Sequence, residues 1–163
     1  MVKLDRIDYR ILDALQENGR LPITQLAAIA GVSVSPCWQR VRRLEESGVI
    51  RHYSAEIALD KLFVVQTVFA HVILSNHTRE TYDTFEKRIK KTPEIVECCE
   101  LAGQFDYLLK FIVTDLDRYN LLLETLLDKS VGVEKYFSYV VTRSIKDSRT
   151  PRVQDLLSRI NLS

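Results

Sequence analysis

The residues with the clearest chemical potential lie in segment 35–47, where apolar and polar side chains alternate at helical spacing. At about 100° per residue, Cys37, Val41 and Leu44 share one stripe of a helix. The side chains on and beside the opposite face are Ser35, Gln39, Arg40, Arg42 and Arg43. In the major groove arginine can read guanine and glutamine can read adenine, while serine and arginine can hold phosphates. The pattern predicts a DNA-binding helix.

A solvated surface is the alternative interpretation, since mixed Arg/Glu faces are common on proteins. Residues 1–60 contain equal numbers of basic and acidic side chains, so the positive charge is local to this helix. The turn at Gly31 and the Ser35-Pro36 helix start favour DNA binding, because Ser is a preferred N-cap and Pro suits a first turn. Trp38, about 90° from the core direction, is expected to brace the helix against its neighbours.

No other residues have the spacing of a metal or catalytic centre. The odd number of cysteines and the lack of Cys-x-x-Cys argue against both a disulfide framework and a zinc site. The histidines are scattered, and the chain has no Gly-rich phosphate loop and no Gly-x-Ser-x-Gly. The side chains considered are Cys37, Cys98, Cys99, His52, His71 and His77. We therefore predict no metal, no cofactor and no catalytic residue.

The adjacent Cys98 and Cys99 raise the alternative of a redox or cysteine-sensing role. Neighbouring residues on a strand point to opposite faces, so a disulfide between them would distort the strand. We expect two small apolar residues instead.

The DNA-binding helix is the last of three expected in residues 1–55. The first ends near Gly19, the second is capped by Thr24 and stopped by Gly31, and the third runs from Ser35 to Gly48. A glycine-containing turn between the last two is typical of a helix-turn-helix. The β-rich residues 49–55 could add a strand or wing.

From residue 64 the pattern changes to strands alternating with helices. The expected elements are a strand at 64–74, a helix at 79–91, strands at 95–102 and 105–113, a helix capped by Asp115, and a strand at 133–141. This βαββαβ order predicts a ferredoxin-like sheet with both helices on one face. The chain is thus α+β, with a head (1–55), a linker (56–63), a βαββαβ domain (64–147) and a tail (148–163) containing a short helix.

The expected strands are apolar on both faces. In 64–74, Phe69 and Ile73 oppose Val68 and Val72. Two helices can cover only one face, and a soluble monomer rarely exposes so large an apolar patch. The pattern predicts that a second copy of the chain covers the other face.

The composition is that of a globular protein, with 46% hydrophobic and 28% charged residues and a net charge of +1. No apolar run approaches the roughly 18 residues of a membrane span. The N-terminus is charged from Lys3 onward and lacks a secretory apolar segment. We expect a cytoplasmic protein.

Longer stretches resemble the Lrp/AsnC family, the leucine-responsive and asparagine-synthetase regulators. The matching pieces are LDRIDYRILDALQENGRLPITQLAAIAGVS, SPCWQRVRRLEESGVI and LAGQFDYLLKF, and the resemblance spans residues 3–147. It implies a DNA-binding transcriptional regulator whose βαββαβ (RAM) domain responds to a small amino acid such as leucine or methionine. It also implies homodimers that assemble further, to octamers or higher.

The resemblance places the effector site in the loop between the second and third strands of that domain. The corresponding residues are Leu101, Ala102, Gly103, Gln104, Phe105, Asp106 and Tyr107. Gly103 could expose backbone N–H groups to an α-carboxylate, and Asp106 could pair with the α-ammonium. From the residues alone, a simple hairpin turn with Gly for conformation and Asp as a local cap is favoured.

Two features depart from the family pattern. Gln104 stands where the family commonly has an acidic residue, which leaves the ligand open. Residues 151–160 add an amphipathic helix where the family often ends.

Two other functions fit the same architecture. A siroheme decarboxylase would need His and Arg residues to hold a carboxylated tetrapyrrole, but only His71 and His77 are available in the domain, and the arginine face of the third helix is intact. An architectural protein would bind DNA without sensing any metabolite.

Overall fold

The computed structural model describes residues 2–126, 131–146 and 150–157 of the 163-residue chain. The chain divides into two compact units, Met1–Glu56 with Lys146–Ser163, and Ile57–Ile145. We call them the head and the sheet domain. The C-terminal segment, expected to be a separate tail, thus belongs to the head.

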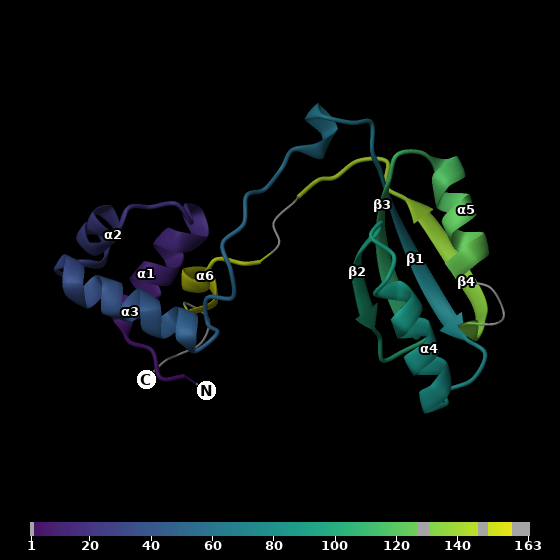
Figure 1. Ribbon diagram of the computed structural model, residues 1–163, viewed down its shortest axis with the longest axis horizontal. Helices are drawn as coiled ribbons and strands as arrows, with labels where there is room; N and C mark the ends of the chain where they lie inside the picture. The colour runs from purple at the N-terminus through teal and green to yellow at the C-terminus, as the bar shows by residue number, and fades with distance from the viewer. Residues whose placement is uncertain (1, 127–130, 147–149, 158–163) are drawn as a thin grey trace. The chain divides into compact units, whose positions relative to one another are not determined.

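The head contains helices α1 (Arg6–Glu17), α2 (Ile23–Ala30) and α3 (Val34–Glu46), shown in Figure 1. The apolar stripes predicted from the sequence meet in one core, with Ile11, Leu26, Cys37 and Leu44 at 2% exposure or less. Gly31 ends α2 at φ 74°, a conformation that glycine adopts without steric cost. The resulting turn between α2 and α3 confirms the helix-turn-helix.

The helix starts differ from those predicted. α2 begins at Ile23 after Pro22, so Thr24 lies inside the helix instead of capping it. α3 begins at Val34 with Ser33 as its N-cap, two residues before the predicted start. Pro36 still lies in the first turn, where a backbone N–H has no partner within the helix.

The predicted strand or wing at 49–55 is not formed, since these residues carry no regular secondary structure. A side chain holds this segment instead, because the Tyr53 hydroxyl donates to Glu45 Oε1 on α3 at 2.9 Å. Burial, followed by the Glu45 carboxylate, raises the pKa of Tyr53 to about 12.

The sheet domain follows the predicted βαββαβ order after a short 3-10 turn at Leu59–Lys61. Its elements are β1 (Gln66–Leu74), α4 (Arg79–Ile89), β2 (Ile95–Glu100), β3 (Tyr107–Val113), α5 (Leu116–Leu126) and β4 (Val133–Val140). The strands pair antiparallel in the order β2-β3-β1-β4. The ferredoxin-like prediction is therefore confirmed, although most elements are one to two residues shorter at their ends than predicted. Asp115 caps α5 as expected, accepting from Arg118 N–H at 2.7 Å.

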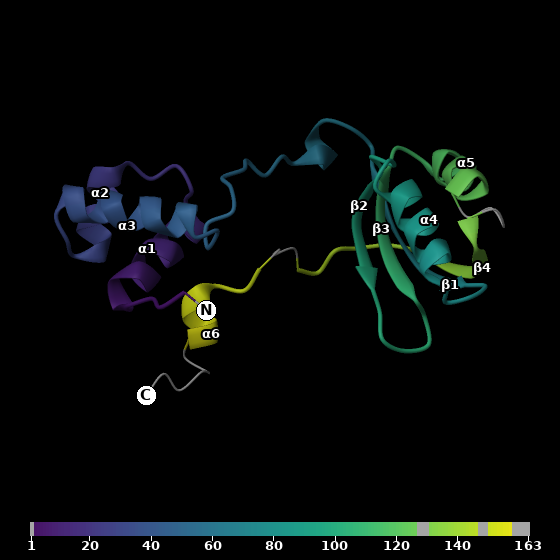
Figure 2. The ribbon, with the colours of Figure 1, turned by 60° about the horizontal axis from the view of Figure 1, so that its bottom comes forward.

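One face of the sheet packs against α4 and α5 (Figures 1 and 2). β1 is buried at every second position, with Val68, Ala70, Val72 and Leu74 under the helices. Phe111 of β3 is also fully buried. Cys98 and Cys99 pair with consecutive residues of β3 and so point to opposite faces, as expected.

The other face, which we call the open face, is not covered by the helices. On β1 it carries Phe69, His71 and Ile73, all partly exposed. β4 places Tyr139 opposite Phe69 and Phe137 opposite His71, and both aromatic rings are exposed. Charged residues also lie on this face: Lys110 of β3 is opposite Phe69, and Lys135 of β4 is opposite Ile73.

No helix in the described parts of the chain is long and apolar enough to cross a bilayer.

Candidate DNA-binding face and ligand-binding loop

A buried carboxylate fixes the position of α3. Asp8 on α1 is 1% exposed, and its oxygens accept from Arg40 Nη1 at 2.8 Å and from Arg43 Nη2 at 2.5 Å. The same carboxylate accepts the backbone N–H of Asp5 at 3.0 Å, completing the capping box of α1. One side chain therefore caps α1 and joins it to α3.

Arg40 also contacts the residue that caps α1, since the same Nη1 lies 2.8 Å from Asp5 Oδ2. The hydrogen bonds that Arg40 donates to Asp5, and then to Asp8, raise the pKa of Arg40. The backbone N–H of Asp8, followed by Arg40, lowers the pKa of Asp5 from its usual 3.8. The stability that Asp5 contributes is present above pH 3.8 and is lost as the pH falls through the lower folded pKa.

The remaining polar residues of α3 lie in the open. Ser35, Gln39, Arg42 and Arg43 are all exposed, and the Arg43 side chain keeps 51% exposure despite its bond to Asp8. Arg42 pairs with Glu46 one turn further along, with 2.8 Å between Nε and Oε1. Arg40 thus differs from the other predicted DNA-binding residues, because it is only partly exposed.

Trp38 does not brace the helix as predicted. Its side chain is 52% exposed, and the Arg42 guanidinium lies 5.4 Å from the ring centroid. This distance is within the range of a cation–π interaction. Trp38 is therefore part of the exposed surface of α3.

In the sheet domain, residues 101–104 form the tip of the predicted effector loop. Ala102, Gly103 and Gln104 are exposed, and Leu101 is partly exposed. Among the described residues, no hydrogen-bond acceptor is found for the backbone N–H groups of Gly103 and Gln104. Two adjacent N–H groups of this kind can bind an anion such as a carboxylate.

Asp106 already has partners within the domain. Its Oδ2 accepts from Leu74 N–H at 2.7 Å, and its Oδ1 lies 2.8 Å from His77 Nε2. Asp106 is 16% exposed, whereas His77 is 63% exposed and lies on the solvent side. The carboxylate therefore ties the loop to the end of β1, the local role favoured by the residues alone.

The two aromatic residues of the loop, Phe105 and Tyr107, point in different directions. Tyr107 is buried, with its ring centroid 4.6 Å from that of Phe85 on α4. Phe105 stacks on His71 at 4.5 Å and meets Phe137 edge-on at 5.7 Å. Tyr107 thus belongs to the core, while Phe105 joins the aromatic cluster of the open face.

Sequence reasoning missed Asp8, although the signal is present. Asp8 lies three and four residues before Ile11 and Leu12, on the apolar side of α1. A carboxylate in such a position requires a buried partner. The arginines of α3 are that partner, although their spacing by itself indicates only a DNA-binding face.

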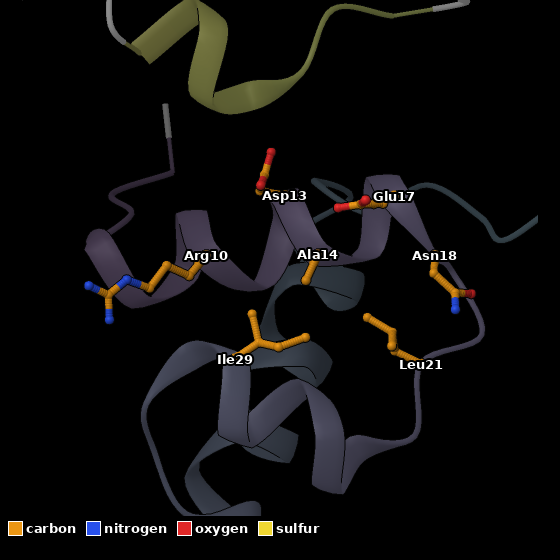
Figure 3. Close-up of a pocket in the computed structure, with 7 residues that line it drawn as sticks. All are labelled: Arg10, Asp13, Ala14, Glu17, Asn18, Leu21 and Ile29. Atoms are coloured by element: carbon orange, nitrogen blue, oxygen red, sulfur yellow. The ribbon is translucent and has the colours of Figure 1, made fainter.

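The residues that the structure describes contain no group of three or more His, Cys, Asp or Glu side chains that could hold a metal ion. A pocket of about 350 Å³ opens on the head between α1 and α2 (Figure 3). Its lining is Arg10, Asp13, Ala14, Glu17, Asn18, Leu21 and Ile29, none of which was predicted as a site residue.

A three-helix head with an exposed Gln/Arg face, followed by a ferredoxin-like domain, defines a helix-turn-helix DNA-binding regulator. Residues 4–51 match the family model described as winged helix-turn-helix DNA-binding, and residues 67–151 match the Lrp/AsnC ligand binding domain. The chain belongs to the Lrp/AsnC family of transcriptional regulators.

Individual relatives agree with this assignment. The transcriptional regulatory protein DoeX of Halomonas elongata is 43% identical over 145 residues, 89% of this chain and 92% of DoeX. The leucine-responsive regulatory protein of Escherichia coli K12 is 39% identical over 89% of this chain and 88% of its own length. These relatives are regulators, and nothing among them supports the siroheme decarboxylase or the architectural alternative.

A solved structure agrees over both units. The transcriptional regulator NMB0573 of Neisseria meningitidis, crystallised as an L-Met complex, has a TM-score of 0.87 and 31% identity. The match covers 95% of this chain and 100% of that one.

Replacing the buried carboxylate tests the junction between α1 and α3. We expect Asp8→Asn to lower the free energy of unfolding of the head by about 2–3 kcal/mol, because it leaves two arginines and one N–H without a charged acceptor. Glu46→Gln is the control: it weakens an exposed ion pair, and we expect a change below about 0.5 kcal/mol. Urea unfolding followed by fluorescence of Trp38, the only tryptophan, measures both. Equal losses in the two variants would contradict the role of Asp8.

Proposed function

We propose that this regulator reads duplex DNA with the exposed face of α3 and changes its binding when an amino acid occupies the loop at residues 101–107. The observation that carries the DNA proposal is that the arginines of α3 differ in their contacts and exposure. Arg40 is committed to Asp5 and Asp8, whereas Gln39 and Arg42 are exposed, and Arg43 keeps 51% exposure although it also pairs with Asp8.

Each exposed residue has a role suited to its chemistry. Gln39, in the middle of α3, and Arg43, in its last turn, are exposed and are the base readers. Ser35, in the first turn, and Arg42, beside Trp38, hold phosphates. Arg40 acts as a positioning residue, because its ion pairs with α1 set the angle at which α3 is presented.

Alanine replacement of the readers tests this assignment. We expect Gln39→Ala or Arg43→Ala to weaken binding to a preferred site by about 1–3 kcal/mol and to relax base preference, whereas Arg42→Ala weakens all duplexes alike. Fluorescence anisotropy over a range of salt concentrations measures both effects. Lys87→Ala on α4 is the control for losing one exposed cation. If the combined Gln39, Arg42 and Arg43 variant binds as wild type does, α3 is not the reader.

The open face is the proposed subunit interface. Exposed Phe137 and Tyr139 lie beside Phe69 and His71, and an apolar surface of this kind is typically buried by a partner. A second copy is the partner proposed, giving a homodimer that assembles further to an octamer or higher.

A charge placed on this face should separate the subunits. We expect wild type to be at least a dimer at micromolar concentration, and Phe69→Asp to shift it toward the monomer, since burying this carboxylate in the interface would be costly even with Lys110 opposite it. Thr84→Asp, on the exposed side of α4, adds the same charge outside the interface and should leave the assembly intact. Light scattering measures the masses. A monomeric wild type would rule out the interface.

The effector proposal combines the loop geometry with the relatives. The N–H groups of Gly103 and Gln104 offer an α-carboxylate site, and Asp106 lies at the base of the same loop. We propose that the ligand's ammonium displaces the exposed His77 ring from Asp106 Oδ1, while Leu74 N–H keeps Oδ2 in place. Leu101 and Ala102 supply apolar contacts. Leucine and methionine are the proposed ligands, since one relative is named leucine-responsive and another was solved with L-Met.

Asp106→Asn tests the ammonium contact without removing the acceptor for Leu74. At a ligand concentration near 100 times the dissociation constant, wild type should gain about 2.7 kcal/mol of stability. For a chain of this size each kcal/mol raises Tm by roughly 2–4 °C. Asp106→Asn should lose this shift, whereas His77→Ala should keep or increase it because a competitor is gone. A thermal-shift screen of all amino acids measures both. A full response in Asp106→Asn would limit Asp106 to its turn role.

A further inference from the structure

The C-terminal segment packs on the helix that supports the DNA-binding face. Residues 150–157, which include α6 (Val153–Leu157), lie along α1 within the head. Arg152 Nη2 lies 3.1 Å from Asp13 Oδ2 and 3.2 Å from Glu17 Oε2. We call residues 150–157 the C-terminal strap.

Backbone and apolar contacts fix the register of the strap. Gln16 of α1 accepts from Val153 N–H at 2.8 Å and donates to the Pro151 carbonyl at 3.3 Å. The Val153 side chain packs against the head core. In Figure 3, Asp13 extends from α1 toward the ribbon of α6, and both Asp13 and Glu17 line the pocket. The strap is thus joined to α1 by charge, hydrogen bonds and apolar contact.

α1 lies between the strap and α3. Asp13, Gln16 and Glu17 face the strap, while Asp8 holds the arginines of α3 from another side of the helix. The strap follows the sheet domain in the chain, whereas α1 precedes it. The head is therefore attached to the sheet domain through two chain segments, one leaving Glu56 and the other arriving after Ile145.

A domain held by two tethers samples fewer orientations than a domain held by one. In a dimer, this restriction raises the effective concentration of the second head at its half-site once the first is bound. We propose that the C-terminal strap is a docking element that makes the second tether and so favours operators with two half-sites over single half-sites. This inference rests on the dimer proposed above.

The ion pairs of the strap are suited to reversible docking. Arg152 and Glu17 are substantially exposed, and exposed ion pairs are weak and screened by salt. Docking can therefore be released without unfolding α1–α3, whose core is formed mainly by their own side chains.

The test uses the full chain and duplexes with one or two copies of a half-site selected from a random pool by the wild-type protein. We expect Arg152→Glu to weaken binding to the two-site duplex by about tenfold. Binding to the single-site duplex should change less than about twofold, because α3 itself is intact. Arg143→Glu, an exposed residue before the strap, is the control for the same change in charge. Val153→Ser should reproduce the pattern by removing the apolar contact, and it replaces Arg152→Glu if that variant does not fold.

A charge exchange identifies the contact. Asp13→Arg combined with Arg152→Glu should restore part of the lost affinity for the two-site duplex, since Glu17 still faces the new carboxylate. Three outcomes would each overturn the proposed role of the strap. They are equal weakening on both duplexes, the same loss in Arg143→Glu, and no recovery in the exchanged pair. Light scattering on the same samples separates the two proposals: a monomeric wild type rejects the dimer, whereas a dimer with no selective effect of Arg152→Glu rejects the strap alone.

Discussion

The head depends on one buried carboxylate with several donors. Asp8 would be costly to bury alone, but Arg40, Arg43 and the N–H of Asp5 satisfy its oxygens. The same contacts remove freedom from α3, whose apolar stripe alone would tolerate small rotations. An ion pair with two arginines one turn apart fixes both the rotation and the height of the helix. The exposed side chains of Gln39 and Arg42 are consequently presented in one orientation.

The sequence predicted the fold because its two halves have different hydrophobic periods. Residues 64–74 are dominated by β-forming side chains, which predicts a strand, and β1 confirms the strand with one face buried and the other partly exposed. The strand expected at 49–55 was wrong, because β propensity needs a pairing partner and Tyr53 bonds to a helix instead. Helix starts at Thr24 and Ser35 were also wrong, since several Ser, Thr and Pro residues compete as caps in these short turns.

The DNA-binding residues were harder to predict than the fold, because the arginines of α3 serve both the contact with α1 and the exposed face. Arg40 and Arg43 lie three residues apart on α3, yet only Arg43 remains half exposed. The distinction depends on Asp8, which is distant in sequence, so periodicity within α3 could not reveal it. Asp106 presents the same problem: its type suits an ammonium group, while its contact with Leu74 N–H is structural. A carboxylate that is anchored through one oxygen can still offer the other, so the two roles are compatible.

The arrangement around α1 suggests how two parts of the chain act on one helix. The strap and the α3 arginines contact different sides of α1, and α1 is a regular helix with a complete capping box. A regular helix bends little over its length, because each turn is hydrogen-bonded to the next. The strap can therefore dock on Asp13 and Glu17, or leave them, without disturbing the contact of Asp8 with α3. Docking then changes how the head is attached to the chain and requires no change in the fold of the head.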